Sequence, residues 1–543
     1  MDTGRDAFNQ PAPLPEGDLF ARHRAMQDTL RHLAPGLDTA PLHALGRLAG
    51  SREMQVHARL AHVHGPQLHT HDRFGHRVDA VEFHPSYHAL MAAAVSAGLH
   101  GAPWAGGSHL ARAAGFMLFT ELEPAVLCPV SMTYAAMPAL RHNAAIEAAW
   151  RPALTARAYD PSPRPWQAKA GLTLGMGMTE KQGGSDVRAN TSRAAPDGED
   201  AWGVRHRLTG HKWFFSAPQS DAHLVIAQAD AGPTCFLLPR VLPEGGRNAV
   251  RLVRLKDKLG NRANASAEVE FDGALAWQVG EAGRGIARIL EMGALTRLDC
   301  ALGTAGLMRQ ALSLALDHAR QRQAFGRPLL AHDLMRNVLA DLALESEAAC
   351  VLALRVAATL DRAGDPREAA LGRLLTPVAK FWVCKRGAAF AQEAMECLGG
   401  NGYVEADGEG VMARIYREMP VNSIWEGASN LMALDLLRAL RQPGAAEALE
   451  SLLGPARGAH PALDAAIAAL PARLAREATE DQARRLAQDL ALAAQAALLW
   501  QCAPAPVALA FTASRLAQAG GGAFGLLPPG LPLDDLLARA MPH

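Results

Sequence analysis

The sequence predicts a mainly α-helical protein with a central β domain. Ala- and Leu-rich stretches with few β-branched residues dominate before residue 170, short strand-like runs separated by turn residues follow, and helical periodicity returns after Gly285. The chain has 543 residues, which is too long for one hydrophobic core. We therefore expect several domains, in the order helices, strands, helical bundle and helical tail.

The domain boundaries follow from shifts in composition along the chain. Prolines are frequent in the first 50 residues, which favours an extended arm followed by short helices, and arms of this kind often pack on a neighbouring subunit. The predicted domains are an N-terminal arm at 1–50, a helical domain at 51–170, a β domain at 171–280, a four-helix bundle at 281–440 and an additional helical tail domain at 441–543.

Two periodicities define the β domain and the bundle. Short apolar runs bounded by turn residues indicate a barrel or a sandwich, and they predict strands at 171–178, 206–216, 222–228, 234–239, 251–255 and 267–271. Apolar residues at helical spacing predict an antiparallel bundle with helices at 286–323, 330–363, 367–398 and 428–440.

Composition limits the classes of function. Lys plus Arg equals Asp plus Glu at 54 each, so no global charge attracts polyanions. The seven cysteines include no Cys-x-x-Cys pair, which fits a reducing compartment. The N-terminus lacks the apolar core of a signal peptide, and the apolar stretch Leu490–Leu499 is too short to cross a bilayer. We expect a soluble, cytoplasmic protein that makes no contact with the membrane.

Histidines are concentrated between residues 57 and 88. His84 and His88 are four residues apart and could share one face of a helix, as the ligands of a metal do. No cysteine and no clean carboxylate partner stands beside them at ligand spacing. Solvated or hydrogen-bonded histidines are therefore expected, and no metal is predicted.

The segment Thr179–Asp186, Thr-Glu-Lys-Gln-Gly-Gly-Ser-Asp, follows a predicted strand. Hydroxyl groups and glycine-exposed amides in that position can line a flat polar ring system and hold a diphosphate. The segment lacks the Gly-x-Gly-x-x-Gly spacing and the βαβ context of a dinucleotide-binding fold. Taken alone, a tight Gly-Gly surface turn explains it equally well.

The segment Lys212–Ser216, Lys-Trp-Phe-Phe-Ser, places three aromatic residues before a hydroxyl on a predicted strand. Side chains alternate along a strand, so Trp213 and Phe215 should point one way and Phe214 the other. Core packing accounts for most strands of this kind. A ring and a hydroxyl beside a planar cofactor would give the same pattern.

Two further motifs lie at helix ends. The segment Arg320–Leu329 contains Arg322, which is free to bind an anion where one helix closes. The segment Glu396–Tyr403 is a glycine-rich loop that a phosphate group could approach closely. A solvated arginine and a plain chain reversal are the alternatives.

The segment Asn422–Asn430, Asn-Ser-Ile-Trp-Glu-Gly-Ala-Ser-Asn, contains the strongest candidate for a catalytic group. Glu426 follows an indole, and burial beside Trp425 would raise the pKa of a carboxyl toward the range useful for proton abstraction. Gly427 allows the backbone or a ligand to come close. A helix cap with a buried aromatic anchor is the alternative.

These motifs occur in one order at wide separations, and the set resembles the acyl-CoA dehydrogenase family of flavoproteins over about residues 85–440. Four segments are most similar in sequence to the bacterial alkylation-response members of that family: Gly175–Val187, His211–Ser216, Pro420–Gly427 and the arm around Phe8–Pro13. The resemblance implies an N-terminal helical domain, a middle β-barrel and a C-terminal helical bundle, here followed by an extra helical domain.

The resemblance also implies an FAD site and a role for Glu426. The implied FAD-binding residues are Met178, Thr179, Gly184, Ser185, Phe214, Phe215, Ser216, Arg322, Phe325, Gly399, Gly400, Asn401, Gly402, Trp425, Gly427 and Asn430. In the family, the arginine motif and the glycine-rich loop reach the FAD of an adjacent subunit, so we expect a homo-oligomer, typically a tetramer. Glu426 aligns with the base that removes the α-proton of an acyl thioester while hydride passes from the β-carbon to the flavin.

Three positions depart from the family pattern. Ala294 stands three residues before Arg297, where many relatives carry Asp, and Asp333 and Glu396 stand where glutamines are common. Because the first change removes a polar contact to coenzyme A, the resemblance implies FAD more directly than it implies a coenzyme A thioester.

The resemblance further suggests a role in the response to DNA alkylation, with binding of double-stranded DNA. The tail carries eight basic and nine acidic side chains, and its arginines are interleaved with acids, which is typical of a salt-bridged helix surface. Residues 240–262 carry a net charge of +5 and are the alternative DNA surface. The competing hypothesis to an enzyme is therefore a flavin-bearing, DNA-binding protective protein with little or no turnover.

Overall fold

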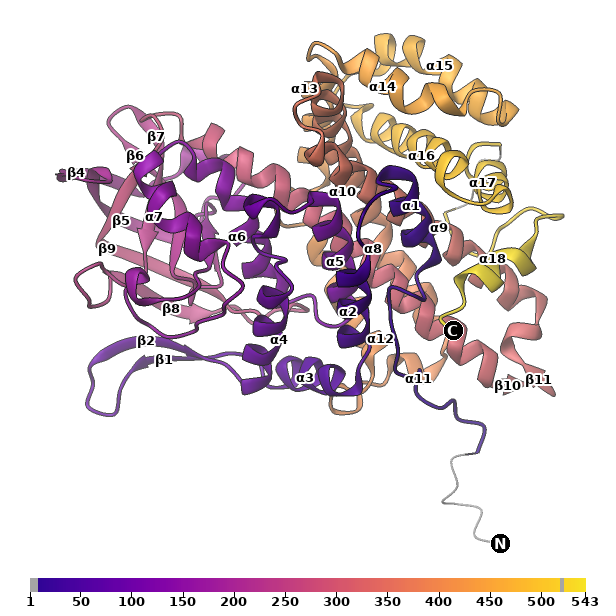
Figure 1. Ribbon diagram of the computed structural model, residues 1–543, viewed down its shortest axis with the longest axis horizontal. Helices are drawn as coiled ribbons and strands as arrows, with labels where there is room; N and C mark the ends of the chain where they lie inside the picture. The colour runs from indigo at the N-terminus through magenta and orange to yellow at the C-terminus, as the bar shows by residue number, and fades with distance from the viewer. Residues whose placement is uncertain (1–7, 518–521) are drawn as a thin grey trace, which may run out of the picture. The chain divides into compact units, whose positions relative to one another are not determined.

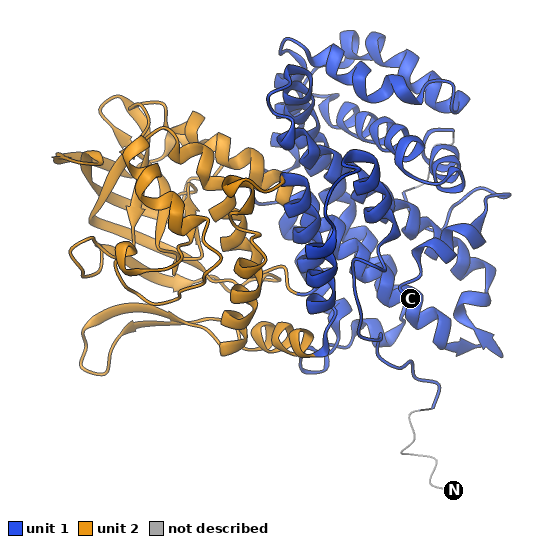
Figure 2. Cartoon of the chain, in the orientation of Figure 1, with its two compact units in different colours: residues 1–52, 109–122, 300–543 blue, residues 53–108, 123–299 orange. Residues whose placement is uncertain are grey.

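The computed structural model describes residues 8–517 and 522–543. The chain folds into two compact units, each assembled from stretches that are distant in sequence (Figure 2). Unit 1 contains the described parts of Met1–Arg52, His109–Leu122 and Cys300–His543, and unit 2 contains Glu53–Ser108 and Glu123–Asp299. The chain passes between the units at four places, and the last of them falls inside one long helix, α8 (Gly285–Gln321). The five-part division predicted above follows composition along the chain and cuts it at other places.

Within the described residues, unit 2 contains a seven-stranded sheet (Figure 1). The strands are β3 (Leu174–Gly177), β4 (Arg193–Asp200), β5 (Gly203–Ser216), β6 (Ala222–Ala229), β7 (Gly232–Pro239), β8 (Val250–Leu255) and β9 (Ser266–Val279). Their order is β3-β6-β4-β5-β9-β7, with β8 paired to β9. Because β7 pairs with both β9 and β6, the sheet closes on itself, which confirms the predicted barrel. Strand β4 was not predicted, since its Pro-Asp-Gly sequence disfavours strands.

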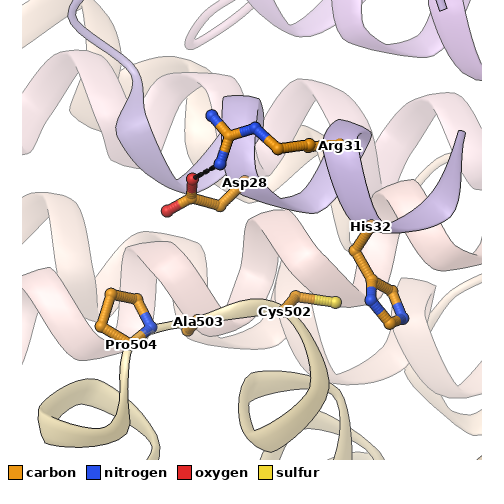
Figure 3. Close-up of a pocket in the computed structure, with 6 residues that line it drawn as sticks. All are labelled: Asp28, Arg31, His32, Cys502, Ala503 and Pro504. Atoms are coloured by element: carbon orange, nitrogen blue, oxygen red, sulfur yellow. Dashed lines mark hydrogen bonds and ion pairs between the residues drawn. The ribbon is translucent and has the colours of Figure 1, made fainter. Parts of the chain in front are cut away.

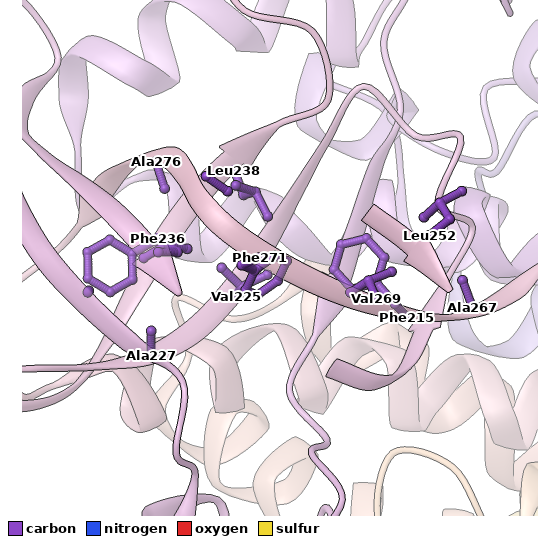
Figure 4. Close-up of a cluster of buried hydrophobic side chains, with 13 residues drawn as sticks. Phe215, Val225, Ala227, Phe236, Leu238, Leu252, Ala267, Val269, Phe271 and Ala276 are labelled. Carbon is purple, nitrogen blue, oxygen red and sulfur yellow. The ribbon is translucent and has the colours of Figure 1, made fainter. Parts of the chain in front are cut away.

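The interior of the barrel is apolar. Strands β6 and β7 contribute nearly continuous buried runs, whereas β5 alternates buried and exposed positions over much of its length. Figure 4 shows the resulting cluster, in which Phe215, Phe236 and Phe271 are the largest side chains. Burying a large apolar side chain contributes roughly 1.5–3 kcal/mol. Packing of this cluster therefore stabilises the barrel of unit 2, including the ends of its strands.

Helices and a hairpin complete unit 2. The helices are α3 (Arg52–Val63), α4 (Pro85–Ser96), α6 (Leu127–Leu140) and α7 (Ala144–Leu154), and α6 packs on β3. The prediction of continuous helices before residue 150 is wrong at 67–82, where β1 (Gln67–His71) and β2 (Arg77–Glu82) pair. The hairpin reverses at Gly75, whose φ is 89°. Its strands alternate exposed with half-buried residues and carry few apolar ones, so the period-2 signal is weak.

Long helices form unit 1. Helix α10 (Pro366–Cys397) packs on α9 (Asp333–Asp361), α12 (Val411–Asn422) and α13 (Ser429–Leu440). Helices α1 (Arg24–Leu33) and α5 (His109–Thr120) also pack on α9, and α2 (Ala40–Ala49) packs on α5. The bundle is confirmed, and its predicted helices begin and end within a few residues of the observed ones. Helix α12 was not predicted, since it contains Pro420 and follows a glycine-rich stretch.

The tail is helical, as predicted. Its helices are α14 (Ala445–Leu453), α15 (Pro461–Glu477), α16 (Ala483–Cys502), α17 (Ala505–Thr512) and α18 (Leu533–Ala540). Helix α16 packs against α9, α10 and α13, while α14 and α15 pack on α16 as an outer layer (Figure 1). Across residues 8–517 and 522–543, no helix combines the length and the apolar character needed to cross a membrane.

Candidate functional site

The residues predicted to bind the cofactor fall on both units. Those between Met178 and Ser216 belong to unit 2, and those from Arg322 onward, together with Glu426, belong to unit 1. Each group has its own structural support, and in each group a buried lysine holds the backbone that carries the predicted residues.

In unit 2, a buried ion pair fixes the loop after β3. The Lys212 Nζ lies 2.8 Å from the Glu180 carboxylate, and both side chains are completely buried. The same ammonium donates to the Ile226 carbonyl at 2.7 Å. Glu180 also accepts hydrogen bonds from the Thr191 amide at 2.6 Å and from its hydroxyl at 3.0 Å. The Thr179–Asp186 loop is thus attached at its second residue to the wall of the barrel.

The charge of Glu180 is well compensated. Burial alone would raise the pKa of Glu180, but the Lys212 ammonium and the hydrogen bonds from Thr191 and Ser192 outweigh burial and lower that pKa to about 2. The carboxylate therefore stays ionised near neutral pH and serves as a structural anchor. Neither partner of this pair was predicted as a site residue, because the two lie far apart in sequence and form no local motif.

A β-bulge presents two aromatic residues at the end of β5. The β5–β9 register shifts between Lys212 and Phe215, so one extra residue is accommodated in β5. Phe214 is 50% exposed, and the Lys256 ammonium lies 3.5 Å from the ring centroid of Trp213 and 4.8 Å from that of Phe214. The Trp213 amide donates to the Thr179 carbonyl at 2.8 Å. The predicted loop and the predicted strand are therefore neighbours.

The bulge also corrects the predicted alternation of side chains. Phe215, expected on the same face as Trp213, is 2% exposed and belongs to the barrel core, where it stacks on His223 at 3.9 Å. Phe215 therefore supports the strand from inside the barrel. Burial lowers the pKa of His223 to about 3, so its ring is neutral and bonds the Ser216 carbonyl at 3.2 Å.

In unit 1, Glu426 sits in an unusual backbone conformation. Its φ is 58° and that of Gly427 is 104°, so a non-glycine residue occupies the left-handed region directly before a glycine. The side chain of Glu426 is half-buried. The indole Nε1 of Trp425 donates to the Asn422 side chain at 3.1 Å, which ties the loop back to α12. Left-handed non-glycine residues cluster at functional sites.

Lys380 of α10 holds the same loop through two hydrogen bonds. Its ammonium donates to the Trp425 carbonyl at 2.8 Å and to the Gly427 carbonyl at 2.5 Å. Lys380 was not predicted as a site residue, because it lies on a helix far from Glu426 in sequence and its hydrogen bonds go to backbone atoms. Beyond the loop, Asn430 is the second residue of α13 and accepts a hydrogen bond at 3.0 Å from Arg484 of the tail.

The arginine motif forms a short hairpin of β10 (Gln323–Ala324) and β11 (Arg327–Pro328). Phe325 at its tip has a φ of 51° and is 97% exposed. The N-terminal arm holds the base of this hairpin. The Asn9 side chain bonds both backbone groups of Gln323 at 2.9 Å, and Arg322 donates to the Asn9 carbonyl.

The glycine-rich loop lies against the same arm. Gly399 has a φ of 59°, and a side chain added at Gly399 or Gly400 would meet no other atom of the chain within 4 Å. Asn401 donates to the Gln10 side chain at 3.0 Å. The arm thus connects the hairpin to the glycine-rich loop within one chain. The prolines in the first 50 residues predicted an extended arm but did not predict this contact.

Histidines and cysteines form no second reactive site. His84 caps α4 by accepting from the Ser86 amide, and His88 bonds the Tyr159 hydroxyl at 2.9 Å, so the two do not share a ligand. In the part of the chain that the structure describes, no three His, Cys, Asp or Glu side chains gather as metal ligands. All seven cysteines are free thiols.

A surface hollow of about 440 Å³ lies between α1 and the link from α16 to α17, away from every predicted residue (Figure 3). Its acid, Asp28, is already paired with Arg31 at 2.6 Å and with Arg539 at 2.8 Å. Burial raises the pKa of Cys502 to about 12, so its thiol is protonated near neutral pH. Asp28 and Cys502 are therefore poor candidates for a base and a nucleophile in this hollow.

The charge of the suspected DNA surfaces is largely paired. Basic side chains of the run 240–262 form ion pairs with acids outside it: Arg247–Asp79, Arg251–Asp272, Arg254–Glu268 and Lys256–Glu268. The value of +5 counted along the chain therefore overstates the positive surface. The tail behaves as predicted, since Arg473 pairs with both Glu477 and Asp489.

Comparison with known proteins agrees with this architecture. Three family models match: the adaptive response protein AidB N-terminal domain at residues 9–161, the acyl-CoA dehydrogenase middle domain at 175–274 and the acyl-CoA dehydrogenase C-terminal domain at 283–441. AidB of Escherichia coli (strain K12) is 46% identical over 522 residues, which cover 95% of each chain. The chain belongs to the acyl-CoA dehydrogenase family.

Other relatives of this AidB-like chain support the assignment. Acyl-CoA dehydrogenase family member 11 of Caenorhabditis elegans is 32% identical over 444 residues, covering 76% of this chain and 68% of that protein. The crystal structure of C. elegans ACDH-11 in complex with C11-CoA superposes with a TM-score of 0.85 at 28% identity, covering 94% of this chain and 93% of that one. The family is flavin-dependent, and the chain is an oxidoreductase of the acyl-CoA dehydrogenase type.

Proposed function

We propose that this protein binds FAD and uses Glu426 to remove the α-proton of an acyl thioester. The observation that carries the proposal is the backbone of Glu426, which is held in the left-handed region with the carbonyls of Trp425 and Gly427 anchored by Lys380. A general base must be placed within hydrogen-bond reach of the proton it takes. A fixed backbone beneath the carboxylate meets that requirement.

The residues of unit 2 fit a flat ring with polar edges. Phe214 exposes half of its surface beside Trp213, whose amide is bonded to the Thr179 carbonyl. The Thr179–Asp186 loop carries the hydroxyls of Thr179 and Ser185, and β5 ends with that of Ser216. Thr179 also needs the glycine at 184, because a Cβ there would lie 2.5 Å from the threonine hydroxyl oxygen. The exposed part of the Phe214 ring is available for stacking on a planar ligand.

The residues of unit 1 fit a cofactor held by a neighbouring subunit. Phe325 is nearly fully exposed, Arg322 lies at the base of the same hairpin, and Gly399 and Gly400 leave their backbone open to an outside partner. A cation, exposed amides and an apolar ring together suit a diphosphate and its adenosine. These features support a homo-oligomer, and we propose a tetramer.

The chemistry divides between the chain and its cofactor. When bound, FAD supplies the acceptor for the hydride that leaves the substrate β-carbon. Glu426 accepts the α-proton, and the half-buried position beside Trp425 limits the water that would otherwise solvate the carboxylate. The C11-CoA bound to the C. elegans relative supports a coenzyme A thioester as substrate. The free thiols support a reducing, cytoplasmic location.

The alternative is a flavin-bearing protein that protects double-stranded DNA during the response to alkylation and turns over little or not at all. The match to the adaptive-response AidB N-terminal domain over residues 9–161 favours it. The paired basic side chains of residues 240–262 and of the tail provide little free positive charge for phosphates. A salt-dependent shift assay with duplex DNA, on chains with and without residues 441–543, separates the two hypotheses.

The proposal is tested by the visible spectrum of the purified protein during anaerobic titration with C11-CoA and butyryl-CoA. We expect a yellow protein whose absorbance near the flavin maximum bleaches with one of these thioesters. Glu426→Gln should keep the colour and lose the bleaching, whereas Glu409→Gln, an exposed glutamate outside the site, should behave as the wild type. A colourless protein that takes up no FAD would contradict the proposal.

A further inference from the structure

Lys380 is buried at a place where a lysine is costly. It lies on α10, its residue is 1% exposed, and its ammonium donates to the carbonyls of Trp425 and Gly427. Within the described residues no carboxylate reaches it as an ion-pair partner. Burying an ammonium without an opposite charge is unfavourable, and an apolar side chain of similar length would avoid that cost.

The two acceptors of Lys380 bracket the predicted base. The Trp425 carbonyl belongs to the peptide plane before Glu426, and the Gly427 carbonyl belongs to the plane after Gly427. One ammonium therefore fixes both ends of a two-residue segment whose φ values are 58° and 104°. The left-handed region is unfavourable for a non-glycine residue, so the surroundings must hold Glu426 there.

A structural explanation for the lysine is incomplete. The helix that follows the loop, α13, already packs on α10, and Met432 and Leu436 are among its buried residues. The loop is also tied to α12 by the Trp425–Asn422 hydrogen bond at 3.1 Å. What Lys380 adds to these contacts is control over the peptide planes around Glu426.

We propose that Lys380 is a positioning residue for the base. It acts through the backbone of residues 425–427 and sets the direction in which the Glu426 side chain leaves the main chain. This inference rests on the proposed function only in so far as Glu426 is the base. The backbone part of the inference stands on geometry and has a readout of its own.

The test compares three variants of the FAD-loaded full chain. Lys380→Met removes the ammonium and keeps the length, and Lys380→Arg restores donors to the carbonyls. Lys385→Met removes an exposed lysine from the same helix as a matched control. Backbone hydrogen–deuterium exchange is followed by mass spectrometry in Asn422–Asn430 and in the first half of α10.

We expect Lys380→Met to raise exchange in Asn422–Asn430 by about tenfold or more while exchange in the first half of α10 stays unchanged. Lys380→Arg should recover most of the protection, and Lys385→Met should match the wild type. Unchanged exchange in the loop would overturn the proposal. Equal loosening of loop and helix would also overturn it, because that result assigns Lys380 a general packing role.

The kinetic readout uses anaerobic flavin reduction by C11-CoA and by butyryl-CoA. Since a misplacement of about 1 Å can cost on the order of 100-fold in rate, Lys380→Met should slow the reduction step by at least about tenfold. The dissociation constant of the thioester should change little. A weaker thioester affinity with an unchanged rate would contradict a positioning role. If neither thioester reduces the wild-type flavin, the proposed function fails, and the exchange experiment still decides whether Lys380 holds the loop.

Discussion

Two buried lysines support the two parts of the candidate site, and they do so in different ways. In unit 2, Lys212 faces the carboxylate of Glu180 at 2.8 Å, so both charges are compensated. In unit 1, Lys380 donates to two carbonyls, at 2.8 and 2.5 Å, and no ion pair to it occurs among the described residues. Lys212 is thus held by an opposite charge, whereas Lys380 is held by neutral backbone acceptors. The loop proposed to line the cofactor is therefore held by an ion pair, and the loop proposed to carry the base is held through its backbone carbonyls.

Breaking the first anchor should give the largest loss of stability. Lys212→Met leaves the completely buried Glu180 without its partner, and such a change typically costs about 3–5 kcal/mol. This loss is measured as the change in the free energy of unfolding, by urea titration at a fixed FAD concentration. The double variant Lys212→Met with Glu180→Gln should recover much of the loss. A single variant as stable as the wild type would show that the pair does not anchor the loop.

The same anchor has a defined pH window. Because the pKa of Glu180 is lowered to about 2 from an ordinary value of 4.5, its contribution is present above pH 4.5 and is lost as the pH falls toward 2. The acid limb of a plot of unfolding free energy against pH should therefore be steeper in the wild type than in the double variant. Equal slopes would contradict an ionised Glu180.

The carboxyl of Glu121 is a third buried ionisable group, and its basic neighbours compensate its charge only in part. Burial raises the pKa of Glu121 to about 8, although Arg309 and Arg22 lie close enough to oppose the shift. The folded chain holds this proton, so its contribution is complete below pH 4.5 and is lost as the pH rises toward 8. Glu121→Gln should remove this decline and stabilise the chain at pH 8 by on the order of 2 kcal/mol. No gain at pH 8 relative to pH 5 would contradict the assignment.

Lys380→Met should destabilise the chain less than Lys212→Met does. It leaves two carbonyls without a donor, at about 1–3 kcal/mol each when both stay buried, but it strands no charge. Urea titration of the two variants side by side tests the order. If Lys380→Met were the more destabilising of the two, the comparison between the anchors would be reversed.

The smallest effect is expected in the N-terminal arm. Asn9→Ala removes two hydrogen bonds to the backbone of Gln323, worth about 0.5–1.5 kcal/mol each. Exchange should rise in the hairpin around Phe325 and the FAD affinity should fall, with little change in global stability. Gln10→Ala loses only its bond to Asn401 and should affect the glycine-rich loop instead. Identical exchange patterns in the two variants would show that the arm does not act locally.

The elements that were predicted correctly are those whose hydrophobic period is visible within one short stretch of sequence. The long bundle helices and the barrel strands other than β4 carry strong periods, and they lie close to where they were expected. The β1–β2 hairpin escaped prediction because its strands are polar and half-exposed. The β5 bulge escaped because nothing in Trp213–Phe214 reveals that an extra residue is accommodated, and so the alternation rule placed Phe215 wrongly.

The residues proposed to contact the cofactor or the substrate were predictable from the sequence, and the contacts that hold them in place were not. Glu426, the Thr179 loop and Arg322 belong to recognisable local motifs, whereas no motif reveals that Glu180 pairs with Lys212 or that Lys380 bonds the loop of Glu426. Glu180 meets Lys212, and Glu426 depends on Lys380, across distances along the chain that no periodic pattern spans. Backbone acceptors make the second case harder, since a carbonyl leaves no trace in the sequence.

The central claim is that a fixed Glu426 takes a proton from an acyl thioester beside a bound flavin. The most direct measurement is anaerobic stopped-flow absorbance of the flavin after mixing with C11-CoA, for the wild type and for Glu426→Gln. We predict bleaching in the wild type and a rate lower by a factor of at least about 1,000 in Glu426→Gln, since a general base contributes roughly 10²–10⁴-fold. Equal rates in the two proteins would contradict the claim.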